Sequence, residues 1–171
     1  MYAKTAALMA TVFAVFMLGN LAASCFAADE AGDLKLSKAL AQAKLFAEFT
    51  DDERDLLKPA AALRHGKAGE RIIVQGETLD RMFIVIEGQT EIWIKGKRIA
   101  AYSGQALVGE FEFLGMGSAT ADVILAKEAD LIELNFAKLN DLVEKQPRLG
   151  CKLMRGIAKI EIQRIIENDK K

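Results

Sequence analysis

The sequence predicts an α+β fold that is mainly β, in which an antiparallel barrel or roll is flanked by an N-terminal and a C-terminal helix. Short segments rich in β-branched residues recur between residues 71 and 134, separated by glycines or charged turns. Helical periodicity precedes and follows them. The chain has 171 residues, of which 51% are hydrophobic and 27% charged, so one domain with a substantial core is expected.

An apolar segment begins the chain. Residues 1–28 carry a single charge, at Lys4, and residues 6–18 form an uncharged run of 13 residues. Gly19-Asn20 then breaks the run, and small residues lead to Ala27. This layout is typical of a secretory signal peptide over residues 1–27, cleaved after Ala27.

A retained membrane anchor is the alternative interpretation. Residues 6–28 number 23, which is enough to span a bilayer if the segment is not cleaved. Either interpretation exports residues 29–171 to the periplasm or to an outward-facing membrane surface. In the anchor interpretation, residues 6–28 would associate with the membrane.

The two cysteines add a constraint. Ala22-Ala23-Ser24-Cys25 is similar to a lipoprotein cleavage site, so acylation of Cys25 is a minority alternative to simple cleavage. Because Cys25 lies in the exported segment, Cys151 would be the sole thiol of the mature chain. An intrachain disulfide is then impossible, and Cys151 is expected to be buried or paired with another chain.

The elements follow in order along the chain. Residues 28–44 show helical spacing, and Thr50 is placed to cap a short helix that stops at Pro59. Helices are again expected from Asn135 to Gln146 and from Arg148 to Glu167. Between them, strands are predicted at residues 71–75, 81–86, 90–95, 97–102, 120–125 and 129–134.

Residues 45–155 resemble the cyclic nucleotide-binding domain family, a β-roll flanked by short helices. The resemblance places the roll at residues 45–146 and the C-terminal helix at residues 147–171. Its glycines fall where a roll must turn tightly. The matching motifs are Leu45-Phe46-x-x-Phe49-Thr50, Ala68-Gly69-Glu70, Val74-Gln75-Gly76-Glu77, Met82-Phe83-Ile84-Val85-Ile86-x-Gly88, Ser103-Gly104, Val108-Gly109-Glu110 and Gln146-Pro147.

The resemblance also implies a ligand site. In the family, the Glu of the Gly-Glu pair accepts the ribose hydroxyl, and an Arg about ten residues later pairs with the cyclic phosphate. Here Gly109-Glu110 matches the sugar end, and Ser118 and Ala119 could supply backbone amides to an anion. The candidate ligand-binding residues are Gly109, Glu110, Gly117, Ser118, Ala119 and Thr120.

The phosphate-binding arginine is absent from this segment. Gly117 stands where the family places it, the loop is about three residues short, and no Lys or Arg occurs between Arg98 and Lys127. Loss of such a contact, worth about 1.5–3 kcal/mol, would weaken binding about tenfold to a hundredfold. A degenerate site is therefore preferred to a functional nucleotide pocket, although a distant arginine such as Arg81 or Arg98 could still replace the missing one.

Other chemistry is sparse. His65 is the only histidine, too few partners accompany it for a zinc site, and Glu110 and Glu112 have no nucleophile beside them. If Glu110 and Glu112 lay in a strand they would share a face. We expect no enzyme activity, no metal and no cofactor. The formal net charge of −1 and the end of the chain at Lys171, where related transcription factors continue into a DNA-binding module, predict no nucleic-acid partner.

The C-terminal helix is the expected partner surface. Leu149, Leu153, Ile157 and Ile160 form one apolar stripe, and its part from Ile157 onward is expected to need cover from a second copy or another protein. The alternative is that this helix folds back against residues 34–47. Two functions stay open: a non-catalytic interaction or accessory module in the cell envelope, and a sensor of a cyclic nucleotide or another small anion.

Overall fold

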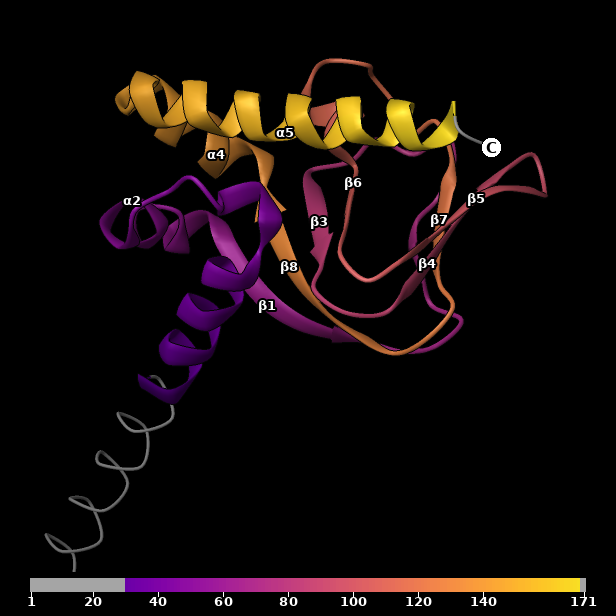
Figure 1. Ribbon diagram of the computed structural model, residues 1–171, viewed down its shortest axis with the longest axis horizontal. Helices are drawn as coiled ribbons and strands as arrows, with labels where there is room; N and C mark the ends of the chain where they lie inside the picture. The colour runs from indigo at the N-terminus through magenta and orange to yellow at the C-terminus, as the bar shows by residue number, and fades with distance from the viewer. Residues whose placement is uncertain (1–29, 170–171) are drawn as a thin grey trace, which may run out of the picture. The chain divides into compact units, whose positions relative to one another are not determined.

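The computed structural model describes residues 30–169, of which residues 36–169 belong to one compact unit (Figure 1). The predicted signal peptide at residues 1–27, the alternative anchor at residues 6–28 and Cys25 lie outside the described residues. Within residues 30–169, no helix is both long and apolar enough to cross a membrane.

Short helices precede the sheets. From residue 30, where the described part of the chain begins, the chain is helical to residue 42, two residues short of the predicted end. Two 3₁₀ turns, η1 (Lys44–Phe46) and η2 (Lys58–Ala60), flank α2 (Asp51–Asp55). The Thr50 hydroxyl accepts a hydrogen bond from the Glu53 amide, and the Glu53 carboxylate accepts one from the Thr50 amide. This capping box confirms the predicted helix start.

Eight strands form two four-stranded antiparallel sheets, in the orders β1-β8-β3-β6 and β2-β7-β4-β5. Both sheets are visible in Figure 1. This arrangement confirms the predicted mainly β roll. The strands are β1 (Ala61–Gly66), β2 (Arg71–Ile73), β3 (Arg81–Val85), β4 (Gln89–Ile94), β5 (Lys97–Ser103), β6 (Ala106–Val108), β7 (Asp122–Leu125) and β8 (Ala129–Asn135).

Two strands were not predicted from the sequence. β1 contains two alanines, an arginine and the sole histidine, so its pattern does not alternate, and β6 has only three residues. Both gain their structure from partners: β1 pairs along its whole length with β8, and β6 pairs with β3. The segment after β6 is the helix α3 (Glu110–Phe113), so the interpretation of Glu110 and Glu112 as strand residues is wrong.

Alternating side chains of the first sheet build two cores. Phe83, Val85 and Leu131 point between the sheets, where they pack with β7 residues such as Val123 and Leu125. Ile84 and Ile132 belong to the other core, which they share with the helices. The period of two in a strand separates these two sets of side chains.

Two helices complete the fold: α4 (Phe136–Lys145), capped by Asn135, and α5 (Pro147–Asn168). Leu149, Leu153 and Ile157 of α5 are buried in the helix-side core together with Leu40 and Ala43. The expectation that the stripe is uncovered from Ile157 onward is therefore wrong at Ile157, which is 1% exposed. This part of α5 folds back against the segment of residues 36–46, as the alternative interpretation held.

The last turns of α5 extend beyond that core. In Figure 1, α5 (yellow) runs from α4 across to the second sheet. There its end lines a cavity with residues of β4, β5 and β7. The exposed apolar residues of this end are Ile162, Ile165 and Ile166.

Candidate functional site

The Gly-Glu pair lies at the junction of β6 and α3. Gly109 has φ = +83° and is the N-cap of α3. A Cβ at this position would lie 3.2 Å from the Met82 Cα and 3.3 Å from the Arg81 carbonyl oxygen, so both backbone conformation and space favour glycine. The tight turn directs Glu110 inward, where only 4% of the residue is exposed.

An arginine from α5 meets the buried carboxylate. Arg164 Nη1 lies 2.7 Å from Glu110 Oε1 and 2.6 Å from Glu161 Oε1. Arg164 Nη2 donates to the Leu107 carbonyl oxygen, and the guanidinium carbon is 4.9 Å from the centre of the Tyr102 ring. Two carboxylates, one carbonyl and one aromatic face therefore hold Arg164.

Burial and the charge of Arg164 shift the pKa of Glu110 in opposite directions. Burial raises the pKa of Glu110 to about 7, from an ordinary value of 4.5, because it disfavours the charged form. The positive charge of Arg164 lowers the pKa and opposes this shift, and the nearby Glu161 carboxylate adds to it. The Glu110 carboxyl therefore titrates near neutral pH.

Two backbone amides of the loop predicted to hold a phosphate are engaged within the protein. The Ala119 amide donates to the Glu77 carbonyl oxygen at 2.8 Å, and the Thr120 amide donates to Glu112 Oε1 at 3.3 Å. Ala119 is buried, whereas Gly117 and Ser118 are exposed, and Gly117 has φ = +87°. Of the two amides predicted to face an anion, those of Ser118 and Ala119, the Ala119 amide is thus satisfied within the protein.

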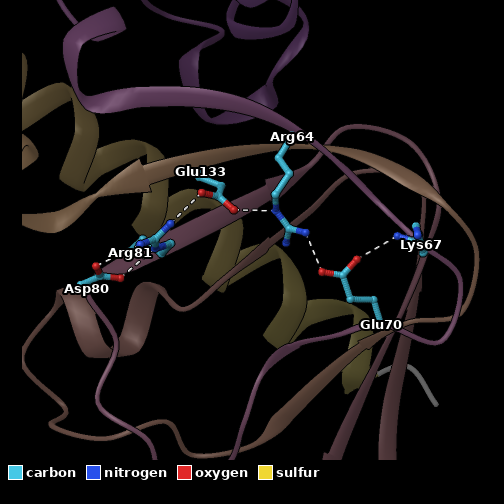
Figure 2. Close-up of polar contacts among 6 residues, drawn as sticks. All are labelled: Arg64, Lys67, Glu70, Asp80, Arg81 and Glu133. Atoms are coloured by element: carbon cyan, nitrogen blue, oxygen red, sulfur yellow. Dashed lines mark hydrogen bonds and ion pairs between the residues drawn. The ribbon is translucent and has the colours of Figure 1, made fainter.

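The two distant arginines considered from the sequence lie elsewhere. Arg81 pairs with Asp80 at 2.7 Å and with Glu133 at 2.8 Å, as Figure 2 shows. Arg98 pairs with Glu91 at 2.7 Å. Neither of these two arginines lines the cavity at Glu110. The distant arginine that does is Arg164.

The spacing of Arg164 along α5 is a signal that sequence reasoning missed. It lies seven residues after Ile157, which is two helical turns, so it continues the buried stripe of α5. A charged residue on a buried stripe requires a partner in the core, and Glu110 is the buried acid that supplies it. The separation of 54 residues between the two gives no local motif.

A cavity of about 400 Å³ lies behind Glu110. Aliphatic side chains of both sheets form much of its wall, and residues of α3 and of the end of α5 also line it. The titratable groups along it are Glu110, Glu112, Glu161, Arg164 and Tyr102. A second cavity, of about 470 Å³, lies between α5, η1 and the β5–β6 connection, and Tyr102, Arg164 and Asn168 line both cavities.

The remaining candidate residues do not form a site. His65 is exposed on β1, with Nδ1 2.9 Å from Asp130 Oδ1. Cys151 is an exposed thiol on α5, so the expectation that it is buried is wrong. Trp93 Nε1 donates to Glu91 Oε2 at 3.1 Å on β4. Between residues 30 and 169, no group of three or more His, Cys, Asp or Glu side chains could hold a metal ion.

These features define a class: an antiparallel roll with a Gly-Glu turn at its cavity and a C-terminal helix beside it. Residues 63–146 match the model of the family described as cyclic nucleotide-binding domain. The domain therefore belongs to the cyclic nucleotide-binding domain family, as the sequence motifs predicted.

Solved structures agree on the fold. A cyclic nucleotide-binding domain from Methylobacillus flagellatus is 20% identical, with a TM-score of 0.68 over 82% of this chain and 81% of that one. The Thermus thermophilus catabolite activator protein is 21% identical, with a TM-score of 0.59 over 74% of this chain and 62% of that one. These likenesses concern the fold.

The curated relatives are longer proteins. Glutaminase 2 of Bradyrhizobium diazoefficiens is 27% identical over 135 residues, which is 78% of this chain and 22% of the glutaminase. Glutaminase 1 of the same organism is 24% identical over 135 residues, again 78% of this chain and 22% of the glutaminase. The chain thus spans about a fifth of the length of the curated relatives it matches.

Proposed function

We propose that this protein is a non-catalytic cyclic nucleotide-binding-like module that acts as an interaction or accessory protein in the cell envelope, with impaired cyclic-nucleotide binding. The contact between Arg164 and Glu110 carries the proposal. The carboxylate that the family resemblance assigns to the ribose hydroxyl already has a charged partner from the same chain.

A nucleotide would have to displace that partner. Arg164 and Glu110 are 15% and 5% exposed at their side chains, and a buried charge left without its partner is costly, at about 3–5 kcal/mol. The phosphate would gain little in return, because the Ala119 and Thr120 amides are engaged and Gly117 offers no charge. Glu112 and Glu161 would face it with charge of the same sign.

A thermal-shift measurement tests the impairment. With cyclic AMP or cyclic GMP at about 1 mM, ligand binding should add no more than about 1.4 kcal/mol to the unfolding free energy, which is the gain that a Kd of about 100 μM would give. A rise in the midpoint of unfolding that corresponds to a larger gain would count against the proposal. Adenosine, which has no phosphate, is the matched control.

Export is the second part of the proposal and rests on the uncharged span between Lys4 and Asp29. In a Gram-negative host, the protein should enter the periplasmic or membrane fraction and begin near Ala28. Intact mass distinguishes simple cleavage from an acylated Cys25 as the first residue. Recovery of the full-length chain from the cytoplasm would contradict export.

Partner binding is the third part. Ile162, Ile165 and Ile166 are 55%, 60% and 44% exposed at the end of α5, and apolar side chains gathered on one helix end favour a protein partner or a second copy of this chain. Light scattering should find a dimer that an Ile162→Asp/Ile166→Asp variant dissociates. The control is Leu56→Asp, because Leu56 is also exposed and directly follows α2. A wild type that stays monomeric at high concentration would count against the homodimer.

One observation favours the alternative function, a ligand sensor. The cavity behind Glu110, at about 400 Å³, has the volume of a small-molecule site. Its charges decide which ligand it could take.

A further inference from the structure

The wall of the cavity behind Glu110 is aliphatic. Ile73, Ile92, Val108 and Val123 line it from both sheets, and Ile165 lines it from α5. A concave site of this size, with aliphatic side chains along much of its wall, is the usual form of a small-molecule site. Burial of the ligand's apolar surface would supply the binding energy.

The charges along the cavity are unfavourable for an anion. Three carboxylates, those of Glu110, Glu112 and Glu161, belong to its lining, and among the described residues that line it Arg164 is the one cation. Arg164 is engaged by Glu110 and Glu161 at 2.7 and 2.6 Å. An anionic ligand would therefore meet net negative charge with no free cation to pair with.

The rim of the cavity is apolar as well. Ile99 of β5, Phe111 of α3 and Ile165 of α5 line the cavity, yet they are 54%, 39% and 60% exposed. These side chains come from three separate elements of the fold. Being both exposed and part of the lining, they add apolar surface that a ligand can contact.

From these three observations we propose that the cavity binds a small apolar molecule without negative charge. This inference rests on the proposed function, because the pairing of Arg164 with Glu110 is what leaves the cavity without a free cation. It changes the chemical class of the ligand from a nucleotide phosphate to an uncharged or cationic apolar compound.

Two fluorescent probes of nearly the same shape test the inference. N-phenyl-1-naphthylamine is uncharged at neutral pH, and 8-anilino-1-naphthalenesulfonate is the same ring system with one added sulfonate. In titrations of the protein at low concentration, the uncharged probe should bind at least about tenfold more tightly, which corresponds to about 1.4 kcal/mol. A smaller preference, a preference for the sulfonate, or no binding of the uncharged probe would overturn the proposal.

Two substitutions, one in the lining and one outside it, locate the binding. Ile165→Asp puts a carboxylate at the rim, and because Ile165 is already 60% exposed the fold should tolerate it. Its affinity for the uncharged probe should fall at least about fivefold, which is about 1 kcal/mol. Leu56→Asp, at a residue 45% exposed that does not belong to the lining, should change the affinity less than about twofold.

Equal effects of the two substitutions would overturn the assignment to this cavity. Ile165 lines the cavity behind Glu110 and not the larger one beside η1, so the Ile165→Asp result also separates these two sites. Tight binding of cyclic AMP in the same titrations would instead defeat the proposed function. The two failures are therefore distinguishable.

Discussion

Glu110 and Arg164 form a charged pair that is almost fully enclosed. The pair connects the turn after β6 with the end of α5, and Arg164 also reaches the Leu107 carbonyl and the Tyr102 ring. Burial raises the pKa of Glu110 and the guanidinium opposes this shift.

Glu110→Gln should change how stability depends on pH. Because the folded protein holds the Glu110 proton up to a pKa of about 7 and the unfolded chain releases it near 4.5, the stability contributed by this proton is complete below pH 4.5. It is lost as pH rises to about 7. The unfolding free energy of the wild type, minus that of the variant, should fall over this window by an amount on the order of 3 kcal/mol.

Urea unfolding of both proteins at several pH values measures this difference. All other titratable groups are the same in the two proteins, so to first order their effects cancel in the subtraction. A difference that rises with pH would mean that Arg164 outweighs burial, and it would contradict the raised pKa of Glu110.

The predictable part of the site is the part with local sequence signals. Gly109 and Glu110 could be identified because a tight turn and an acid adjoin in the chain, and the structure has the turn at Gly109. Arg164 could not be identified as their partner, because pairing across 54 residues depends on where α5 docks. The engagement of the Ala119 amide by Glu77 likewise depends on two loops that only the fold brings together.

At the scale of elements, α5 docks closely on η1. A Cβ added at Gly156 would lie 2.8 Å from the Leu45 carbonyl oxygen, which is too close for a real contact. Glycine is therefore required here by space, although glycine within a helix is less favourable than alanine by about 1 kcal/mol.

Gly156→Ala should destabilise the protein in spite of its better helix propensity. We expect the unfolding free energy to fall by about 1–2 kcal/mol, because the helix must move away from η1. Gly32→Ala, where an added Cβ meets nothing within 4 Å, is the control and should not destabilise. A gain of stability in Gly156→Ala, measured by chemical denaturation, would contradict the close docking of α5.

An ion-pair network connects strands of the first sheet (Figure 2). Glu133 of β8 accepts hydrogen bonds from Arg64 of β1 at 2.6 Å and from Arg81 of β3 at 2.8 Å. Arg64 also pairs with Glu70, which precedes β2 of the other sheet, at 2.5 Å. The Glu133 side chain is 15% exposed and each arginine is more exposed, so solvent screens the network in part.

Glu133→Gln should lower the unfolding free energy by about 1–3 kcal/mol, because two arginines lose a shared charged acceptor. Asp141→Asn is the matched control: it removes the charge that pairs with Lys145 on the exposed face of α4, and its effect should stay within about 0.5 kcal/mol. Equal effects of the two substitutions would show that the network contributes no more than a surface pair.

Element boundaries were predictable where hydrophobic alternation is strong. β3, β5 and β8 lie within one residue of their predicted ranges, and α4 begins one residue after its predicted start, Asn135, which caps it. β1 and β6 were not predictable, since a strand of mixed composition and a strand of three residues are specified by their partners in the sheet. The local sequence pattern does not specify which distant strands pair with each other.

At the scale of the whole molecule, α5 contributes to both stability and the site. Its first half is buried in the core with Leu40 and Ala43, and its second half supplies Arg164 to the two cavities. Any ligand that needs Glu110 must therefore compete with the docking of this helix. We propose that α5, and not a nucleotide, satisfies the Gly-Glu end of the pocket.

Isothermal titration calorimetry with cyclic AMP and cyclic GMP tests this claim most directly, on the wild type and on Arg164→Ala. The account predicts no affinity better than a Kd of about 100 μM for the wild type, equivalent to a binding free energy weaker than about −5.5 kcal/mol. Arg164→Ala should also bind weakly, because Gly117 still offers no charge to the phosphate. Submicromolar binding of either nucleotide to the wild type would contradict the account.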